Sequence, residues 1–103
     1  MGKIIAAVSI TPLGTETPSV SRYVAAALRK LEKYKDIQHQ TDAMFTILYG
    51  EKERVFQAIF DMQEAVFEEG AKRVSTVIKI DERRDKELSS PDEKLESLRK
   101  HIF

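Results

Sequence analysis

Hydrophobic residues near the start of the chain recur at every second position, which predicts a β-strand over residues 3–11. One side of this strand is wholly apolar and carries Ile4, Ala6, Val8 and Ile10. The opposite side begins with Ile5 and Ala7 and then changes to the hydroxyls of Ser9 and Thr11. Because both sides are largely apolar, we expect a central strand that is covered on both faces.

Apolar residues three or four positions apart predict two helices farther along the chain. The first is expected to start at Pro18, because proline suits the first helical turn, and to end near Tyr34 or Lys35. The second covers residues 51–69, and Gly70 follows it where a left-handed C-terminal cap is expected. The apolar stripe of the second helix consists of Val55, Ile59, Met62 and Val66.

Three further short stretches have the composition and alternation of strands: residues 37–41, 44–49 and 72–80. A terminal helix is predicted after them. Residues 90–93 read Ser-Pro-Asp-Glu, which is a capping box with proline at the first helical position. We expect this helix to continue to about His101.

The order β-α-β-β-α-β, followed by a terminal helix, is typical of an α+β ferredoxin-like sandwich. The 103 residues suit a single domain over residues 1–103. Two helices cover only one face of such a sheet, yet Ile5, Ala7, Ile47 and Val77 fall on the other face. Leaving them in water costs roughly 25 cal/mol per Å². We therefore expect oligomerisation through the sheet, with a second copy of the chain covering this face.

Charge and composition narrow the possible partners. Lysine plus arginine and aspartate plus glutamate number 17 each, so no net positive charge attracts phosphates and no nucleic-acid partner is expected. The absence of cysteine excludes disulfides, thiolate catalysis and cysteine-based zinc sites. The longest apolar run, residues 4–8, is too short to cross a membrane, so we expect a cytoplasmic protein with no membrane partner. The absence of asparagine and the many Glu, Lys and Arg residues are typical of a thermophile.

Hydroxyl side chains gather at the junction between the first strand and the first helix, residues 11–21. Hydroxyls both donate and accept hydrogen bonds, which suits a heteroaromatic ligand with mixed polar edges. The beginning of the following helix adds main-chain donors. On a second interpretation, the same residues only cap the helix and turn the chain. The residue pattern leaves both interpretations open.

Catalytic and metal-binding patterns are not evident in the sequence. His39 and His101 each lack a second histidine at metal-ligand spacing. No acid–base pair stands out, so we expect no enzyme activity, no metal and no cofactor. The mixed charge run of residues 81–87 contains Arg83 and Arg84, which suit either local surface ion pairs or carboxylates across a subunit contact.

Several longer segments together resemble a known family. They are Pro12-Leu13-Gly14-Thr15, Pro18-Ser19-Val20-Ser21 with Tyr23-Val24, the polar positions Thr41, Met44 and Thr46, and the segments 68–74 and 78–85. In this order and spacing they resemble the thiamine-binding, YkoF-like family of small ferredoxin-like proteins. The first segment is the most specific, and the resemblance covers nearly the whole chain.

The resemblance implies ferredoxin-like subunits that assemble through their sheets, commonly as a tetramer that is a dimer of dimers. It also implies that the chain binds thiamine, or its hydroxymethylpyrimidine part, without catalysis, as a carrier or buffer. The side chains expected to line the pocket are Ser9, Thr11, Thr15, Ser19, Ser21, Thr41, Met44, Phe45 and Thr46.

Two departures from the family pattern lie beside this pocket. Phe45 stands where a small residue is usual, and Asp42-Ala43 replaces a turn that usually contains proline. Phe45 either stacks on a pyrimidine ring or fills the space of one; strand alternation puts it opposite Met44 and Thr46. Glu16 and Asp42 are the candidates to offset the positive charge of thiazolium.

A different class of function also fits the pattern. The chain would then be a structural or ligand-sensing homo-oligomeric module, and the same junction would bind an anion or a protein partner.

Overall fold

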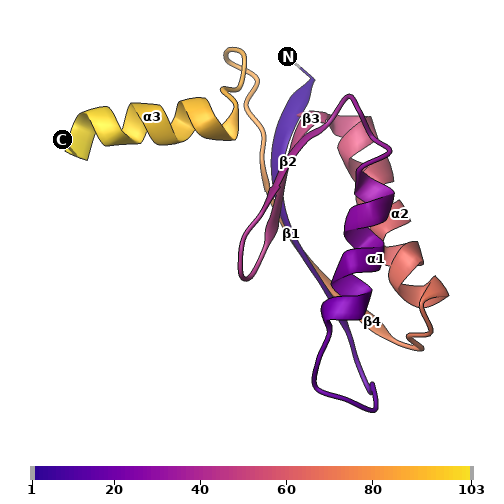
Figure 1. Cartoon of the computed structure of the whole chain (residues 1–103). Helices are drawn as coiled ribbons and strands as arrows, with labels where there is room; N and C mark the ends of the chain where they lie inside the picture. Colours follow the sequence, from indigo (N-terminus) through magenta and orange to yellow (C-terminus); the bar gives the residue numbers. More distant parts are fainter. Residues whose placement is uncertain (1, 103) are drawn as a thin grey trace.

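The computed structural model describes residues 2–102 and is built around one antiparallel sheet with strand order β2-β3-β1-β4 (Figure 1). Its strands are β1 (Lys3–Pro12), β2 (Gln38–Thr41), β3 (Thr46–Glu51) and β4 (Val74–Asp81). The helices in these residues are α1 (Ser21–Leu31), α2 (Lys52–Glu68) and α3 (Pro91–Ile102). The expected α+β ferredoxin-like order with an extra C-terminal helix is confirmed, and β1 is a central strand.

The register of β1 differs on its two sides. Its pairing with β3 runs from Lys3↔Glu51 to Val8↔Thr46. Its pairing with β4 continues through Pro12↔Val74. Residues 9–12 are therefore held by β4 alone, and the side of β1 toward the β2–β3 turn lacks a neighbouring strand there.

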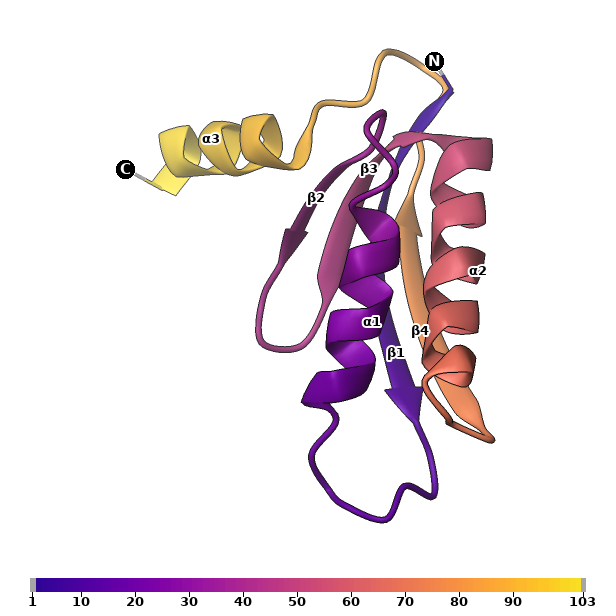
Figure 2. The ribbon, with the colours of Figure 1, turned by 45° about the vertical axis from the view of Figure 1, so that its right-hand side comes forward.

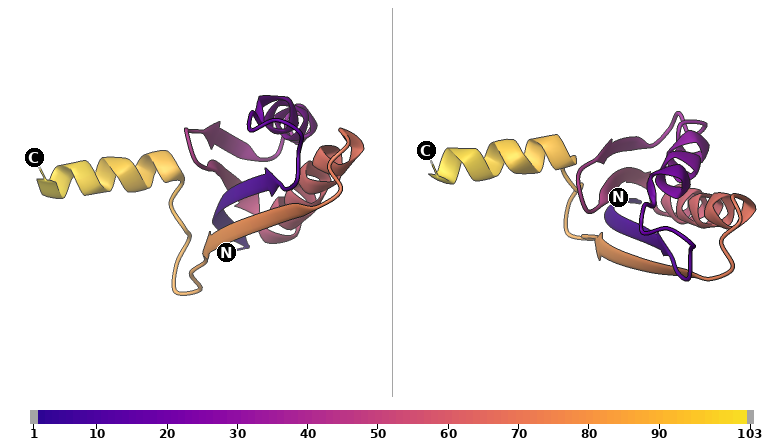
Figure 3. Two further views of the ribbon diagram at one scale, coloured as in Figure 1. Left: turned by 90° about the horizontal axis from the view of Figure 1, so that it is seen from below. Right: turned by 60° about the horizontal axis from the view of Figure 1, so that its bottom comes forward.

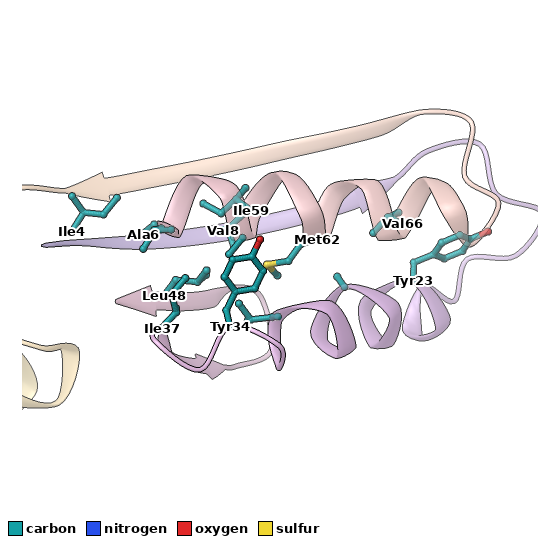
Figure 4. Close-up of a cluster of buried hydrophobic side chains, with 14 of the residues drawn as sticks. Ile4, Ala6, Val8, Tyr23, Tyr34, Ile37, Leu48, Ile59, Met62 and Val66 are labelled. Carbon is teal, nitrogen blue, oxygen red and sulfur yellow. The ribbon is translucent and has the colours of Figure 1, made fainter. Parts of the chain in front are cut away.

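Helices α1 and α2 cover one face of the sheet (Figure 2). The core between the layers joins the inward side chains of β1 and β3 to the facing sides of the two helices (Figure 4). Its largest fully buried side chains are Ile4, Val8, Leu31, Leu48, Val55, Ile59 and Val66. The alternation in β1 and the helical stripe predicted for α2 thus meet in a single core.

The opposite face of the sheet is not covered by either of these helices, contrary to the expectation that β1 is covered on both sides. The register places Ile5, Ala7, Ile47 and Val77 on this face, which we call the open face. Val77 is 56% exposed, and Ile5 and Ile47 are half-buried. Within residues 2–102, one copy of the chain leaves an apolar surface in water.

Helix α3 projects away from the sheet (Figure 3). The Tyr49 hydroxyl donates to the Leu88 carbonyl at 2.8 Å, and Lys94 pairs with Asp81, which together anchor the start of α3. The predicted cap is present, because the Ser90 hydroxyl accepts from the Glu93 N–H at 3.2 Å. The apolar side of α3 remains exposed and consists of Leu95, Leu98 and Ile102.

The segment between β4 and α3 holds the charge run noted in the sequence. Arg83 donates to Asp85 at 2.7 Å, and Arg84 lies 3.6 Å from Glu82. Local ion pairs of this exposed kind contribute little to stability. Both groups thus form local surface ion pairs, and a contact of Arg83 and Arg84 with carboxylates across a subunit boundary stays a prediction.

Several boundaries differ from the sequence prediction. Helix α1 begins at Ser21 rather than Pro18 and ends at Leu31 rather than near Tyr34. Its late start has a local cause, since the Thr17 hydroxyl accepts the N–H of Ser19 at 3.0 Å and holds the preceding residues in a turn. Strand β3 begins at Thr46 instead of residue 44.

A cluster of polar side chains joins the end of α1 to α2. The Tyr34 hydroxyl donates to Asp61, and the guanidinium of Arg54 lies 4.7 Å from the centre of the Tyr34 ring. Arg54 also binds Asp36 with two hydrogen bonds of 2.8 and 3.1 Å. Burial, followed by the hydrogen bond to Asp61, raises the pKa of Tyr34 from 10.0 to about 12.

We predict that Tyr34 makes stability depend on pH in the alkaline range. Because the folded state holds the phenol proton more tightly, its contribution is complete below pH 10.0 and is lost as pH rises to about 12. Replacing Tyr34 with Phe should lower the free energy of unfolding at neutral pH by about 1 kcal/mol. In urea titrations, the difference between wild type and variant should shrink across that range; a difference that stays constant would contradict the assignment.

Candidate functional site

A hollow of about 170 Å³ lies beside the free side of β1, between the first turns of α1 and the β2–β3 turn. Figure 2 shows these three segments at the same end of the molecule. The residues that line the hollow are Val8, Ser9, Ile10, Thr11, Val20, Val24, Ala27, Leu28, Thr41, Asp42, Ala43, Met44, Phe45, Thr46 and Met62. We call this the β1–α1 hollow.

The register of the sheet produces the hollow. After the pair Val8↔Thr46, β3 gives way to the β2–β3 turn, whereas β1 continues to Pro12. The missing strand leaves room beside Ser9 and Thr11. Val20 and Val24 of the α1 segment form the opposite wall.

The β2–β3 turn is held by Asp42. Its Oδ1 atom accepts the N–H groups of Met44 and Phe45, each at 2.9 Å. The N–H of Asp42 donates to the carbonyl of Phe45, also at 2.9 Å. The hydrogen bonds from Phe45 and then Met44 lower the pKa of the Asp42 carboxyl below its usual 3.8, so it is ionised at neutral pH.

Hydroxyl groups and an apolar wall meet in the hollow. The hydroxyls of Thr41 and Thr46 lie 3.1 Å apart, and Thr46 is only 7% exposed. Val20 holds the N-cap position of α1, where no side chain of residues 2–102 forms a capping hydrogen bond. At the beginning of α1, Val20 and Val24 supply part of the apolar wall of the hollow.

The structure places six of the nine residues predicted for the pocket along this hollow. Those lining the β1–α1 hollow are Ser9, Thr11, Thr41, Met44, Phe45 and Thr46. Thr15 instead lines a second hollow of about 370 Å³, together with Glu16, Arg22 and Lys72. Ser19 and Ser21 are exposed and line neither hollow. Which of these side chains contact a ligand stays a prediction.

The hydroxyl-rich junction therefore divides into two parts. The Thr15 hydroxyl donates to the Thr17 carbonyl at 2.7 Å, and the Thr17 hydroxyl accepts from the Ser19 N–H at 3.0 Å. These bonds support the turn-forming interpretation for residues 15–19. Ser9 and Thr11, at the strand end, border the β1–α1 hollow, and strand alternation puts their side chains on the same face of the sheet as Ile5 and Ala7.

Strand alternation does not apply to Phe45, contrary to the prediction from the sequence. Because β3 begins at Thr46, Met44 and Phe45 belong to the turn and do not follow the pleat of the strand. All three residues line the same hollow, and Phe45 is half-buried. The aromatic ring is thus part of the wall.

Sequence reasoning missed the helical side of the hollow. Val20, Val24, Leu28 and Met62 are not among the residues predicted for the pocket, yet they form its apolar surface. These residues lie on the faces of α1 and α2 that point toward the β2–β3 turn. Such a surface becomes visible only when the register of β1 against β3 is known.

Metal-binding clusters and membrane-spanning helices are both absent from residues 2–102. No three His, Asp or Glu side chains there lie close enough to hold a metal ion together. No helix in that part of the chain is long and apolar enough to cross a bilayer.

The structure is a small α+β domain with a hollow at the β1–α1 junction. A family described as "Thiamine-binding protein" matches residues 6–99, so the chain belongs to this family, as the resemblance in its sequence implied. The UPF0045 protein YqgV of Bacillus subtilis is 46% identical over 101 residues, which is 95% of this chain and 96% of that protein.

Solved structures agree with this assignment. Protein MJ1052 of Methanocaldococcus jannaschii superposes with a TM-score of 0.84 at 39% identity, covering 95% of this chain and 97% of that one. TM0486 of Thermotoga maritima, described as a candidate thiamine biosynthesis/salvage protein, has a TM-score of 0.76 at 18% identity. It covers 93% of this chain and 98% of that chain, and at this identity it supports the fold alone.

Proposed function

We propose that the chain is a non-catalytic binder of thiamine, or of its hydroxymethylpyrimidine part, and that the pyrimidine ring occupies the β1–α1 hollow. The observation that carries this proposal is the meeting of an aromatic residue and hydroxyl residues in one preformed hollow of a thiamine-binding family member. Its role would be that of a carrier or buffer.

The size of the hollow supports a single ring as its occupant. Pockets that enclose drug-sized ligands measure about 300–1,000 Å³. At about 170 Å³, the β1–α1 hollow is smaller and suits the pyrimidine better than the whole of thiamine. The thiazolium ring would then lie at the mouth.

The lining matches the chemistry of an aminopyrimidine. Its flat faces are apolar, and Phe45 and Met44 offer an aromatic ring and a thioether to contact them. Its edge carries both hydrogen-bond donors and acceptors. Thr41 and Thr46 can meet either kind, because a hydroxyl donates and accepts.

The absence of catalysis is part of the proposal. General acid–base chemistry needs titratable groups within reach of the reacting atoms. Asp42 is the one ionisable side chain among the residues of the described chain that line the hollow, and two main-chain N–H groups already engage it. A single carboxylate that already accepts two hydrogen bonds is better suited to holding a ligand than to transferring a proton.

We predict that both thiamine and hydroxymethylpyrimidine bind to the wild-type protein in isothermal titration calorimetry. Replacing Thr41 with Val removes one hydroxyl from the hollow and keeps the shape of the side chain. The loss of one hydrogen bond should weaken both ligands by about three- to tenfold. Thr15→Val is the matched control; it changes the second hollow and should leave both affinities unchanged.

A different result would favour the alternative, an interaction module for an anion or a protein partner. The wild type would then give no binding heat, and neither small molecule would raise its melting temperature, as a true ligand must by mass action. Equal losses in the Thr41→Val and Thr15→Val variants would reject the β1–α1 hollow as the site.

The proposal also includes a homo-oligomer, with a tetramer as the expected assembly. The open face and the apolar side of α3 border a groove of about 700 Å³, lined by Ile5, Ile47, Leu95 and Leu98 among others. In one copy these surfaces stay exposed to water. A second copy would remove both from solvent, because a closed, self-complementary contact buries the same patch on each subunit.

We expect wild-type protein to exceed the mass of one chain in size-exclusion chromatography with light scattering. Val77→Glu places a charge on the open face and should shift the protein to monomer, since an unpaired charge is costly at an apolar contact. Phe60→Glu is the matched control: Phe60 is 63% exposed but lies on α2, outside the open face. A monomeric wild type, or equal dissociation by both variants, would contradict the proposed contact.

A further inference from the structure

The side chains around the β1–α1 hollow carry a charge of one sign. Among residues 2–102, Asp42 supplies the one ionisable group in its lining. Glu16, the other acidic candidate near the junction, lines the second hollow. There it shares the surface with the cationic groups of Arg22 and Lys72. The side-chain charge at the β1–α1 hollow is therefore negative and comes from a single carboxylate.

The position of this carboxylate is fixed before any ligand arrives. Both hydrogen bonds that hold it, from the N–H groups of Met44 and Phe45, end on Oδ1. Neither bond uses Oδ2. The turn thus orients Asp42 while its second oxygen and most of its charge remain available, and the side chain loses little further freedom on binding.

The two parts of thiamine differ in charge in a way that this arrangement can distinguish. The thiazolium nitrogen is quaternary, so it has a permanent positive charge and no N–H to donate. Hydroxymethylpyrimidine is neutral near pH 7.5. Asp42 lines the hollow and is exposed to solvent. Its carboxylate therefore attracts a thiazolium at the solvent side of the hollow by charge alone and gives the free pyrimidine no comparable gain.

We infer that Asp42 is a specificity-determining residue that makes this site prefer the cationic, intact thiamine over its neutral pyrimidine part. The inference rests on the proposed function, since it takes the pyrimidine to occupy the hollow and the thiazolium to lie at its mouth. Asp42 acts through the long-range attraction of its charge, while the turn that it holds keeps Phe45 in the wall.

The substitution Asp42→Asn separates these two roles. An asparagine Oδ1 still accepts the N–H groups of Met44 and Phe45, so the turn is preserved while the charge is removed. The sharpest probe is 3-deazathiamine, in which a neutral thiophene replaces the thiazolium in a molecule of nearly the same shape. Titration calorimetry of wild type and variant with thiamine, 3-deazathiamine and hydroxymethylpyrimidine isolates the effect of charge.

For wild type, we expect thiamine to bind more tightly than 3-deazathiamine. In Asp42→Asn, the ratio of the two affinities should fall by about two- to fivefold, the range for exposed charge pairs, with hydroxymethylpyrimidine unchanged. Raising NaCl from about 20 mM to about 500 mM should lower the same ratio in wild type and have little effect in the variant. Glu16→Gln is the control and should behave as wild type.

The outcomes separate this inference from the proposed function. If Asp42→Asn weakens all three ligands equally, or changes none, the charge of Asp42 does not select the ligand, although the binding function stands. If Glu16→Gln produces the change in ratio, the second hollow supplies the charge and the inference is wrong. If wild type binds none of the three, the proposed function itself fails.

Discussion

The difference in length between the two pairings of β1 is the constraint on which the site depends. β1 remains paired with β4 to Pro12, but its pairing with β3 stops at Val8. Main-chain groups of a strand need hydrogen-bond partners, so an unpaired side of a strand must contact water, another segment or a ligand. Here the turn after β2 and the beginning of α1 approach this side without filling it. The β1–α1 hollow is the space that remains.

The two faces of β1 have different roles. On the helix side, Ile4, Ala6 and Val8 anchor the core that fixes α1 relative to the sheet. On the open side, Ile5 and Ala7 are only half-buried within residues 2–102. The apolar residues of β1 thus stabilise the core on one face of the sheet, and on the other face they form an apolar surface suited to a partner. The hollow lies at the end of this strand, where its sequence changes from apolar residues to hydroxyls.

Much of this organisation could be predicted from the sequence. The periodicities of β1 and α2 are strong because each buries one regular face, and they led to the correct fold order. The capping box at Ser90 was also readable, since it depends only on neighbouring residues. The start of α1 could not be read in this way: Pro18 suits a first helical turn, but the Thr17–Ser19 hydrogen bond favours a turn before the helix.

The site was harder to predict than the fold, for a physical reason. Hydroxyl residues look alike in a sequence whether they line a pocket or hold a turn. Ser9 and Thr11 differ from Thr15 through the register, which pairs the end of β1 with β4 and leaves its β3 side without a partner strand. Likewise, Phe45 joins the wall because Asp42 forms a turn and delays the start of β3. The first outcome depends on strand pairing between segments that are distant along the chain. The second depends on the hydrogen bonds of one local turn, which residue types alone do not reveal.

The most direct test of the account is to map the backbone amide NMR signals while hydroxymethylpyrimidine is added to the protein. Occupation of the β1–α1 hollow should shift the signals of residues 9–11 and 41–46 together with that of Val20, because these groups surround one ring. Shifts confined to residues 13–17 or to the open face, with residues 41–46 unchanged, would show that the hollow is not the binding site.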